Sequence, residues 1–444
     1  MSNYKPFVLG ATALVLTTVA VTGAGLHYSQ SKAYIKDSPK EIVDEVWYVI
    51  NKEYVDGTFN QNDWRDVRKE YLEKDYANKE EAYDAIREML GLLEDPYTRF
   101  MPPEDFENMQ IDTSGELTGV GIQITKDKET EEVVVIAPIE DTPAFEAGII
   151  AKDVIVAVDE TPTEGMELND VVNLIRGKRG SEVVLTIRRG EADESEIIEF
   201  PIVREVIQIH PVKAKVDANS IGNIGYIRLT QFSGQATGEM REAIADFEKQ
   251  NVDGYILDLR SNPGGLLYAS IDIAQMWLNE GGIVSTVNRV GEVDRQDAKA
   301  KALTDKPLVV LVDGGSASAS EILSGALQDN ERAVLVGTQT FGKGLVQSVR
   351  RLGDDSGMAV TIAKYLTPSG RDINKEGIAP DFVIEIDEAV REELQEDRTK
   401  IGTMADPQYS KAVQLLDEKL RTGTIVIPEK QAVTKPKEKA PADG

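Results

Sequence analysis

Apolar and polar residues follow three successive patterns along this chain. Between residues 38 and 100 the apolar residues recur every three or four positions, a spacing typical of amphipathic helices. Ser38 and Pro39 suit the cap and first turn of the first of these helices. Two further helices are predicted over residues 64–75 and 79–93. The pattern therefore predicts a small helical domain over residues 38–100.

Short strands are predicted between Asp105 and Arg204, where apolar residues alternate with polar ones or form brief runs. The expected strands begin at Gly119 and cover residues 133–136, 154–158 and 183–188, with short helices over 143–148 and 168–176. Glycine and proline separate these pieces. We expect a β-rich domain over residues 103–204.

Beyond residue 205 buried strands alternate with amphipathic helices. Strands are predicted over residues 224–229, 255–259, 283–287, 308–312, 334–336, 345–349 and 358–365, and helices over 236–250, 266–278 and 318–327. Such alternation is typical of α/β domains, whose functional loops lie at the carboxyl ends of the strands. The fold class is therefore multidomain α/β, with an α/β core over residues 205–385.

Both ends of the chain differ from this pattern. Residues 7–26 form an uncharged run of 20 residues, about enough to span a bilayer, so 1–30 is predicted as an N-terminal membrane anchor or signal segment. An uncleaved anchor would place a single-pass protein at the cell membrane with its catalytic domains on the extracytoplasmic side; cleavage would make it secreted or periplasmic. C-terminal helices are predicted within 386–422, and a disordered tail over 423–444.

Composition excludes several chemistries. The chain has no cysteine, which rules out thiol proteases, disulfides and thiolate metal sites. It has two histidines: His27 lies in the N-terminal apolar segment, and His210 precedes a proline in a predicted linker. No zinc-binding pattern is present, so we expect neither a metal nor a cofactor. The net charge of -28 argues against a nucleic-acid partner.

Candidate catalytic residues follow the predicted strand 308–312. The sequence Asp-Gly-Gly-Ser-Ala-Ser-Ala-Ser-Glu at 313–321 allows a sharp turn into a helix, whose first N–H groups favour an anion. Ser318 is the candidate nucleophile, and Lys343, in Phe-Gly-Lys-Gly, is the candidate base. A buried lysine can lose its charge and act as a base. The alternatives are a capping box formed by Ser318 and Glu321, or a nucleophile at Ser316 or Ser320.

Lys343 also ends a Gly-x-x-x-x-Gly-Lys sequence that starts at Gly337 and is typical of phosphate-binding loops. The next residue is Gly344, which lacks the hydroxyl that holds magnesium in such loops. The residues that follow prefer a strand, so no helix N-terminus would meet a phosphate. The sequence does not favour nucleotide binding.

The β-rich segment resembles a PDZ domain. The resemblance depends on the glycine-flanked segment 119–122, on Pro-Ala-x-x-Ala-Gly at 143–148 and on the Asp-Val-Ile-x-x-Val-Asp that follows. In that family, backbone N–H groups hold the C-terminal carboxylate of a peptide, which adds to the sheet as a strand. By analogy the carboxylate site is formed by Gly119, Val120, Gly121 and Ile122. A tight turn that needs glycine is the alternative reading of this segment.

Together, Gly-Ser-Ala-Ser-Ala-Ser-Glu, Phe-Gly-Lys-Gly and the PDZ-like segment resemble the C-terminal processing (tail-specific) serine proteases, peptidase family S41. The resemblance extends to about Asp381. It implies a serine endopeptidase with a Ser-Lys dyad that recognises exposed, apolar C-termini of protein substrates. Carried over by residue, the nucleophile is Ser318, the base is Lys343 and Gln347 orients the lysine.

The resemblance also implies an oxyanion hole of main-chain N–H groups, from Ala319 together with Gly264 or Gly265. It implies a homodimer formed through the helical ends. Arg176 is a candidate for coupling peptide binding to the active site. The alternative from another class is a membrane-anchored PDZ scaffold that binds peptides without turnover.

Overall fold

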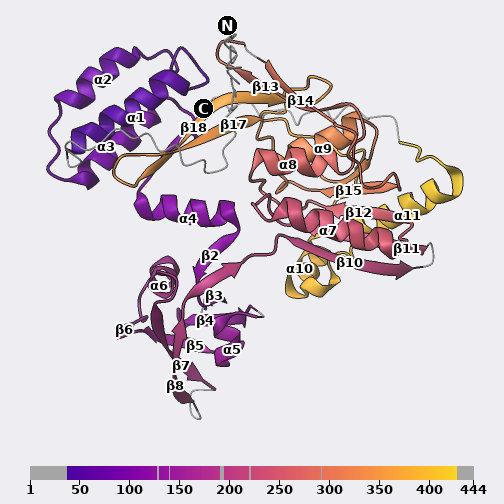
Figure 1. Cartoon of the computed structure of the whole chain (residues 1–444), viewed down its shortest axis with the longest axis horizontal. Helices are drawn as coiled ribbons and strands as arrows, with labels where there is room; N and C mark the ends of the chain where they lie inside the picture. The colour runs from indigo at the N-terminus through magenta and orange to yellow at the C-terminus, as the bar shows by residue number, and fades with distance from the viewer. Residues whose placement is uncertain are drawn as a thin grey trace, which may run out of the picture.

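The computed structural model describes residues 38–127, 130–139, 141–190, 195–219, 222–291 and 293–427. The predicted anchor, residues 1–30, and residues 428–444 of the predicted tail lie outside these ranges. Among the residues described, no helix combines the length and the apolar character needed to cross a bilayer. Figure 1 shows three parts: a helical region, a β-rich unit at the lower end and an α/β unit.

The helical region contains α1 (Pro39–Glu53), α2 (Trp64–Glu73) and α3 (Lys79–Gly91). Pro39 begins α1 and Ser38 is its N-cap residue, as predicted, although the Ser38 side chain makes no capping hydrogen bond. Asp63 and Asn78 do cap α2 and α3, because their side chains accept hydrogen bonds from backbone N–H groups of the first turn. The apolar faces of the three helices pack together as their spacing predicts.

Part of the core of the helical region comes from the far end of the chain. Leu352, Met358 and Val360 pack among the buried side chains of α1, α2 and α3. The strand after α3, β1 (Arg99–Met101), pairs antiparallel with β18 (Gly357–Leu366). The same antiparallel sheet contains β13 (Gly282–Asn288), β14 (Val293–Asp297) and β17 (Leu345–Arg351). One sheet thus joins the helical region to the α/β unit (Figure 1).

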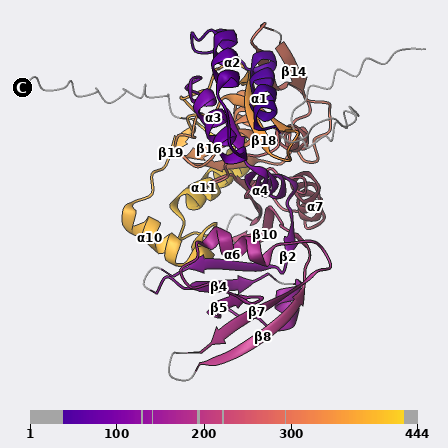
Figure 2. The ribbon, with the colours of Figure 1, turned by 90° about the vertical axis from the view of Figure 1, so that its left-hand side faces the viewer.

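Residues 103–114 form helix α4 (Pro103–Ser114), whereas the sequence analysis predicted short strands from Asp105. Pro103 in the first turn, two acidic residues beside it and Gly115 in the left-handed conformation after the last turn are all helix signals. Phe106 on this helix packs against Met101 and Ala359. The helix therefore belongs to the packing around β1 and β18, between the helical region and the β-rich unit (Figure 2).

The β-rich unit, called the β unit here, is an antiparallel sheet with the strand order β3-β4-β5-β7-β8. Its strands are β3 (Ile122–Lys126), β4 (Val133–Pro138), β5 (Val154–Val158), β7 (Glu182–Arg189) and β8 (Glu196–Val203); β6 (Thr161–Pro162) pairs with β5. Helices α5 (Pro143–Ala147) and α6 (Leu168–Ile175) complete it. The chain enters through β2 (Glu116–Gly119) and leaves through β9 (Glu205–Gln208), which pair with each other.

The α/β unit has a six-stranded sheet in the order β10-β11-β12-β15-β16-β19. Its strands are β10 (Val212–Asn219), β11 (Gly222–Leu229), β12 (Gly254–Asp258), β15 (Leu308–Val312), β16 (Val334–Gly337) and β19 (Phe382–Val383). All but β10 run parallel. The strand predicted over 283–287 is part of β13, which lies in the other sheet.

Helices cover both faces of this sheet. On one face lie α7 (Ala236–Lys249), α8 (Leu267–Gln275) and α9 (Ala319–Asp329), whose apolar residues pack with Leu257, Val310 and Leu335. On the other lies α11 (Pro407–Thr422), packed on Ile256 and Val309. Between β19 and α11 the chain forms α10 (Glu388–Glu396) and a 3-10 turn (Arg398–Lys400). Parallel strands covered on both faces explain the continuous apolar runs in the sequence.

Candidate active site

Two of the three candidate serines are buried and engaged with the main chain. The Ser316 hydroxyl donates to the Leu259 carbonyl (2.8 Å) and the Ser320 hydroxyl to the Asn262 carbonyl (2.9 Å). Neither side chain is exposed to solvent. These two hydrogen bonds instead link the turn after β15 to the turn after β12. Ser318 is partly exposed at the start of α9, so it is the candidate best placed to meet a substrate.

The backbone of Ser318 has an unusual conformation, with φ 55° and ψ -112°. A non-glycine residue in such a region is strained, and strain of this kind concentrates at functional sites. The surroundings hold it in place: the Ser318 carbonyl accepts hydrogen bonds from the N–H groups of Glu321 (2.9 Å) and Ile322 (3.0 Å). The sharp turn predicted from the small residues around Ser318 is therefore present.

The carboxylate of Glu321 connects the serine turn to the lysine turn. It accepts hydrogen bonds from the N–H groups of Ser318 (2.8 Å), Gly342 (2.7 Å) and Lys343 (2.9 Å) and from the Thr340 hydroxyl (2.6 Å). In the sequence, Glu321 indicated only a helix cap. The Ser-x-x-Glu spacing was the available signal, and the capping contact to the Ser318 N–H is only one of four contacts of this carboxylate.

Tyr365 on β18 makes a second connection between the two turns. Its hydroxyl is hydrogen-bonded to the Ser318 carbonyl (3.2 Å) and to the Lys343 carbonyl. Full burial raises the pKa of this tyrosine well above its ordinary value, so the side chain stays a neutral donor. The main chains of Ser318 and Lys343 therefore share two partners, Glu321 and Tyr365.

Lys343 lies in an environment that favours its neutral form. Burial is the largest cause lowering the pKa of its amine, and the positive charge of Arg99 adds to it. The charges of Asp95 and Glu321 oppose this shift, but the pKa remains below its ordinary value. The amine lies 4.9 Å from the centre of the Tyr97 ring. Such a lysine is suited to accept a proton.

Gln347 lies on β17, four residues after Lys343, and pairs in register with Thr361 on β18. Its side chain is partly buried. The orientation of Lys343 by Gln347, which the resemblance implies, stays a prediction.

The glycine loop after β12 lies against the serine turn. A β-carbon at Gly264 would come within 2.6 Å of the Ala317 carbonyl oxygen and 2.9 Å of the Ala319 nitrogen, so only glycine fits. The Gly264 N–H donates to the Asn262 side chain (2.9 Å). Gly265 packs instead against the main chain of Phe232. Of the two glycines, Gly264 is therefore the neighbour of Ala319.

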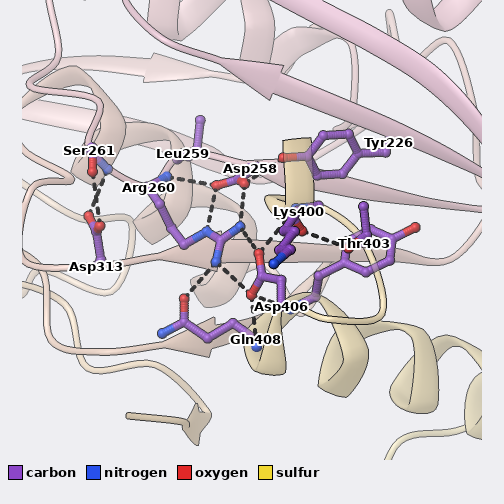
Figure 3. Close-up of polar contacts among 12 residues, drawn as sticks. Tyr226, Asp258, Leu259, Arg260, Ser261, Asp313, Lys400, Thr403, Asp406 and Gln408 are labelled. Carbon is purple, nitrogen blue, oxygen red and sulfur yellow. Dashed lines mark hydrogen bonds and ion pairs between the residues drawn. The ribbon is translucent and has the colours of Figure 1, made fainter. Parts of the chain in front are cut away.

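A buried network of charged side chains lies next to the glycine loop that follows β12 (Figure 3). Arg260 is bonded to Asp258 at the end of β12 (2.9 and 2.7 Å) and to Asp406 at the start of α11 (3.1 and 2.7 Å). Gln408 accepts from the same guanidinium (2.9 Å), and the Tyr226 hydroxyl donates to Asp258 (2.7 Å). The guanidinium offsets the burial of Asp258 and keeps its pKa below the ordinary value. Sequence reasoning missed the network because its members are far apart in the chain.

The predicted carboxylate-binding segment of the β unit forms a turn before the edge strand β3. Gly121 has φ +83°, and a β-carbon there would lie 2.4 Å from Thr142, so glycine is required. The carbonyls of Val120 and Gly121 accept hydrogen bonds from Ala144 and Ile139 (2.8 Å each). Gly119 ends β2 and Ile122 begins β3. The tight-turn reading is thus correct, and it leaves the peptide-binding role a prediction.

Helix α6 of the β unit touches α4 through two polar pairs. Arg176 donates to the Asn108 side chain, and Asn173 donates to Glu104.

Elsewhere His210 pairs with Glu239 (2.6 Å), which links the start of β10 to α7. Within the described ranges, acidic and histidine side chains form no group of three that would hold a metal ion.

The sequence matches the family model of peptidase family S41 over residues 223–384 and that of the PDZ domain over residues 134–189. It is 45% identical over 394 residues to the carboxyl-terminal-processing protease of Synechocystis sp., covering 88% of this chain and 89% of the relative. It is 43% identical over 409 residues to that of Picosynechococcus sp., covering 92% and 95%.

A solved structure, that of a photosystem II D1 C-terminal processing protease, is 37% identical to this chain. It superposes with a TM-score of 0.55, over 84% of this chain and 99% of the other. The fold and site thus define an α/β peptidase with a PDZ domain. The chain belongs to peptidase family S41, among the carboxyl-terminal-processing proteases. The β unit is its PDZ domain, and the α/β unit contains its peptidase core.

Proposed function

We propose that this protease cleaves peptide bonds with Ser318 as the nucleophile and Lys343 as the general base. The observation that carries the proposal is the shared support of the two residues. One buried carboxylate, Glu321, accepts hydrogen bonds from both of their N–H groups. The strained backbone of Ser318 and the lowered pKa of Lys343 are further support, because both are typical of residues that do chemistry.

In this mechanism the neutral amine of Lys343 accepts the hydroxyl proton of Ser318 as the oxygen attacks a peptide carbonyl. The ammonium then gives its proton to the leaving amine, which leaves an acyl-enzyme. Lys343 next removes a proton from water, which hydrolyses the ester and restores Ser318. Gln347 would orient the lysine amine.

The negative charge that develops on the attacked oxygen would be held by main-chain N–H groups at the start of α9. Ala319 provides one, and Gly264 is favoured over Gly265 for the other because it lies against Ala319. A substrate oxygen would replace Asn262 as the acceptor of the Gly264 N–H. Each such donor contributes about 100- to 1,000-fold to the rate.

Substrates would be chosen by the PDZ domain. Among the described strands β3 pairs only with β4, so its other edge could accept an added strand, and the turn from Gly119 to Ile122 would hold the terminal carboxylate through its N–H groups. The proposed ligands are protein C-termini with apolar side chains. Arg176 would connect peptide binding to the rest of the enzyme, because its contact with Asn108 joins α6 to α4.

The cellular location and the oligomeric state of the protein are proposed from the sequence alone. Residues 7–26 have the length and composition of a single membrane span, and we propose that this segment anchors the protein in the cell membrane. The proposal places the catalytic domains on the extracytoplasmic side, which the lysines flanking the span do not fix by themselves. Cleavage of that segment would release the enzyme as a secreted or periplasmic protein. We also propose a homodimer formed through the helical region.

The test uses the full chain and an unfolded reporter peptide with an apolar C-terminus. We expect Ser318→Ala to abolish cleavage and Lys343→Ala to lower kcat by about 100- to 10,000-fold. Lys364→Ala, which removes an exposed lysine on β18, is the matched control and should cleave normally. Full activity of Ser318→Ala would contradict the assignment. Binding of the reporter without cleavage by the wild type would support a PDZ scaffold without turnover.

A further inference from the structure

The segment between α3 and β1 reaches the catalytic lysine from outside the peptidase core. Tyr97 in this segment belongs to the helical region and lies outside both residue ranges that match family models. Its ring centre is 4.9 Å from the Lys343 amine. An aromatic ring at this distance covers one side of the amine and attracts its charged form, but this attraction is weaker than the hydration that the cover removes.

The segment is held firmly in this position. The Asp95 carboxylate accepts hydrogen bonds from the Tyr97 N–H (3.0 Å) and the Thr98 hydroxyl (2.7 Å). The Thr98 hydroxyl in turn accepts from the N–H of Thr361 on β18 (3.1 Å). Thr361 is the cross-strand neighbour of Gln347 on β17, the strand that follows Lys343. Tyr97 and Lys343 are therefore fixed to the same pair of strands.

The charged and titratable groups around the amine come from several elements. Asp95, Tyr97 and Arg99 come from the segment before and at the start of β1, and Glu321 comes from α9. Tyr365 from β18 is hydrogen-bonded to the Lys343 carbonyl. Burial and Arg99 favour the neutral amine, whereas Asp95 and Glu321 favour the charged one. The helical region and the start of β1 therefore supply part of the cover and two of the charges, those of Asp95 and Arg99.

We propose that Tyr97 is a positioning residue for Lys343: its ring shields the amine from water and keeps it directed into the site. The proposal rests on the proposed Ser-Lys mechanism. It implies that the helical region is part of the active site. Without the helical region, the Lys343 amine of the peptidase core would lack the Tyr97 ring that shields it from water.

The test measures kcat/KM for the reporter peptide against pH, using the full chain. Tyr97→Phe keeps the ring and should cleave like the wild type. Tyr97→Ala removes the weak attraction of the ring for the ammonium but lets water reach the amine. Water stabilises the ammonium more than one ring face does, so the acidic limb of the profile should move to higher pH. We expect kcat/KM at pH 7 to fall by about 10-fold or more, part of the usual contribution of a general base.

Arg99 provides an independent arm, because its side chain is exposed and its replacement should leave the fold intact. Arg99→Gln removes a positive charge near the amine, so the acidic limb should again move to higher pH. Arg99→Lys keeps the charge and should leave the limb in place. An acidic limb that stays in place or moves to lower pH in Tyr97→Ala would overturn the proposal, whatever the result for Arg99→Gln.

Two further variants separate this proposal from the mechanism on which it rests. Cleavage by Lys343→Ala at the wild-type rate would contradict the Ser-Lys mechanism itself. An inactive Lys343→Ala combined with a Tyr97→Ala that keeps the wild-type rate and pH profile would overturn only the role of Tyr97.

Discussion

The helical region and the PDZ domain are attached to the peptidase core in different ways. The helical region shares a sheet with the core through β1 and β18, and it shares buried residues such as Met358. The PDZ domain has a hydrophobic core drawn from its own strands and helices. It joins the rest through the β2-β9 ribbon and the polar contacts of α6 with α4 (Figures 1 and 2).

This difference separates two roles. A region that shares a core with the catalytic strands unfolds with them, so it can only be a fixed part of the site. A domain with its own core and a small polar interface is free to change its position relative to its neighbours. We therefore expect Tyr97 to lie in a fixed part of the enzyme and the proposed peptide site in a part that can change its position.

The largest effect is expected from a cavity in the shared core. Ile86→Ala should lower the free energy of unfolding by about 2–5 kcal/mol, because Ile86 is fully buried in α3. The helical region and the peptidase core should lose stability together, which urea unfolding followed by both near-UV circular dichroism and residual activity would detect.

Leu185→Ala in the PDZ domain is the matched control, because Leu185 is equally buried. It should destabilise only the PDZ domain and leave the unfolding of the peptidase core at the same urea concentration. If Ile86→Ala produced a separate transition while the core stayed unchanged, the two attachments would not differ as described.

A smaller change in the free energy of unfolding is expected from loss of the hydrogen bond between Tyr83 and Asp354. The Tyr83 hydroxyl donates to this buried carboxylate (2.6 Å), so Tyr83→Phe should cost about 1.5–3 kcal/mol. Burial raises the pKa of Asp354, but hydrogen bonds from Ser356 and Tyr83 outweigh it, and the pKa lies below its ordinary value of 3.8.

A carboxyl whose pKa is lower in the folded than in the unfolded protein stabilises the fold at any pH above its unfolded-state pKa. This stabilisation is lost as the pH falls through the folded-state pKa. The difference between wild type and Tyr83→Phe should therefore be full above pH 3.8 and shrink below it. Chemical unfolding at a series of pH values measures this. A difference that stayed constant down to pH 2 would show that the carboxylate is not involved.

The smallest change in stability is expected for Arg176→Ala at the contact between α6 and α4. Loss of a partly exposed polar contact should change the free energy of unfolding by about 0.5 kcal/mol or less. Activation of cleavage by a C-terminal peptide should nevertheless weaken. Unchanged activation in this variant would remove Arg176 from the proposed coupling, and Asn108→Ala tests the other side of the contact.

Local patterns predicted most of the elements but not the way they join. The spacing of apolar residues indicated the three N-terminal helices and the parallel strands, and the small residues around Ser318 indicated a sharp turn. The pairing of β1 with β18 could not be read in this way, because a short strand such as 99–101 gains its partner only through the fold. Helix α4 was missed although its proline and acidic residues were visible.

The candidate site shows the same limit. Ser318 and Lys343 could be predicted as candidates because each lies in a distinctive local motif. Glu321, Tyr365 and Tyr97 could not, because their importance comes from contacts between distant segments. The ion pair between Arg260 and Asp406 could not be predicted for the same reason. The two residues are far apart in the sequence, and a charged residue can be predicted to be buried only when its partner is known.

The pairing of β1 with β18 also has a consequence for the newly made protein. Phe100 lies opposite Met358, so β1 and the helices before it leave the ribosome long before the strand that completes their core. Until β18 is made, Lys343 has neither Tyr365 nor the firmly held Tyr97 beside it. A growing chain therefore cannot assemble the site early, and an unfinished protease would leave its own unfolded parts and neighbouring chains uncut.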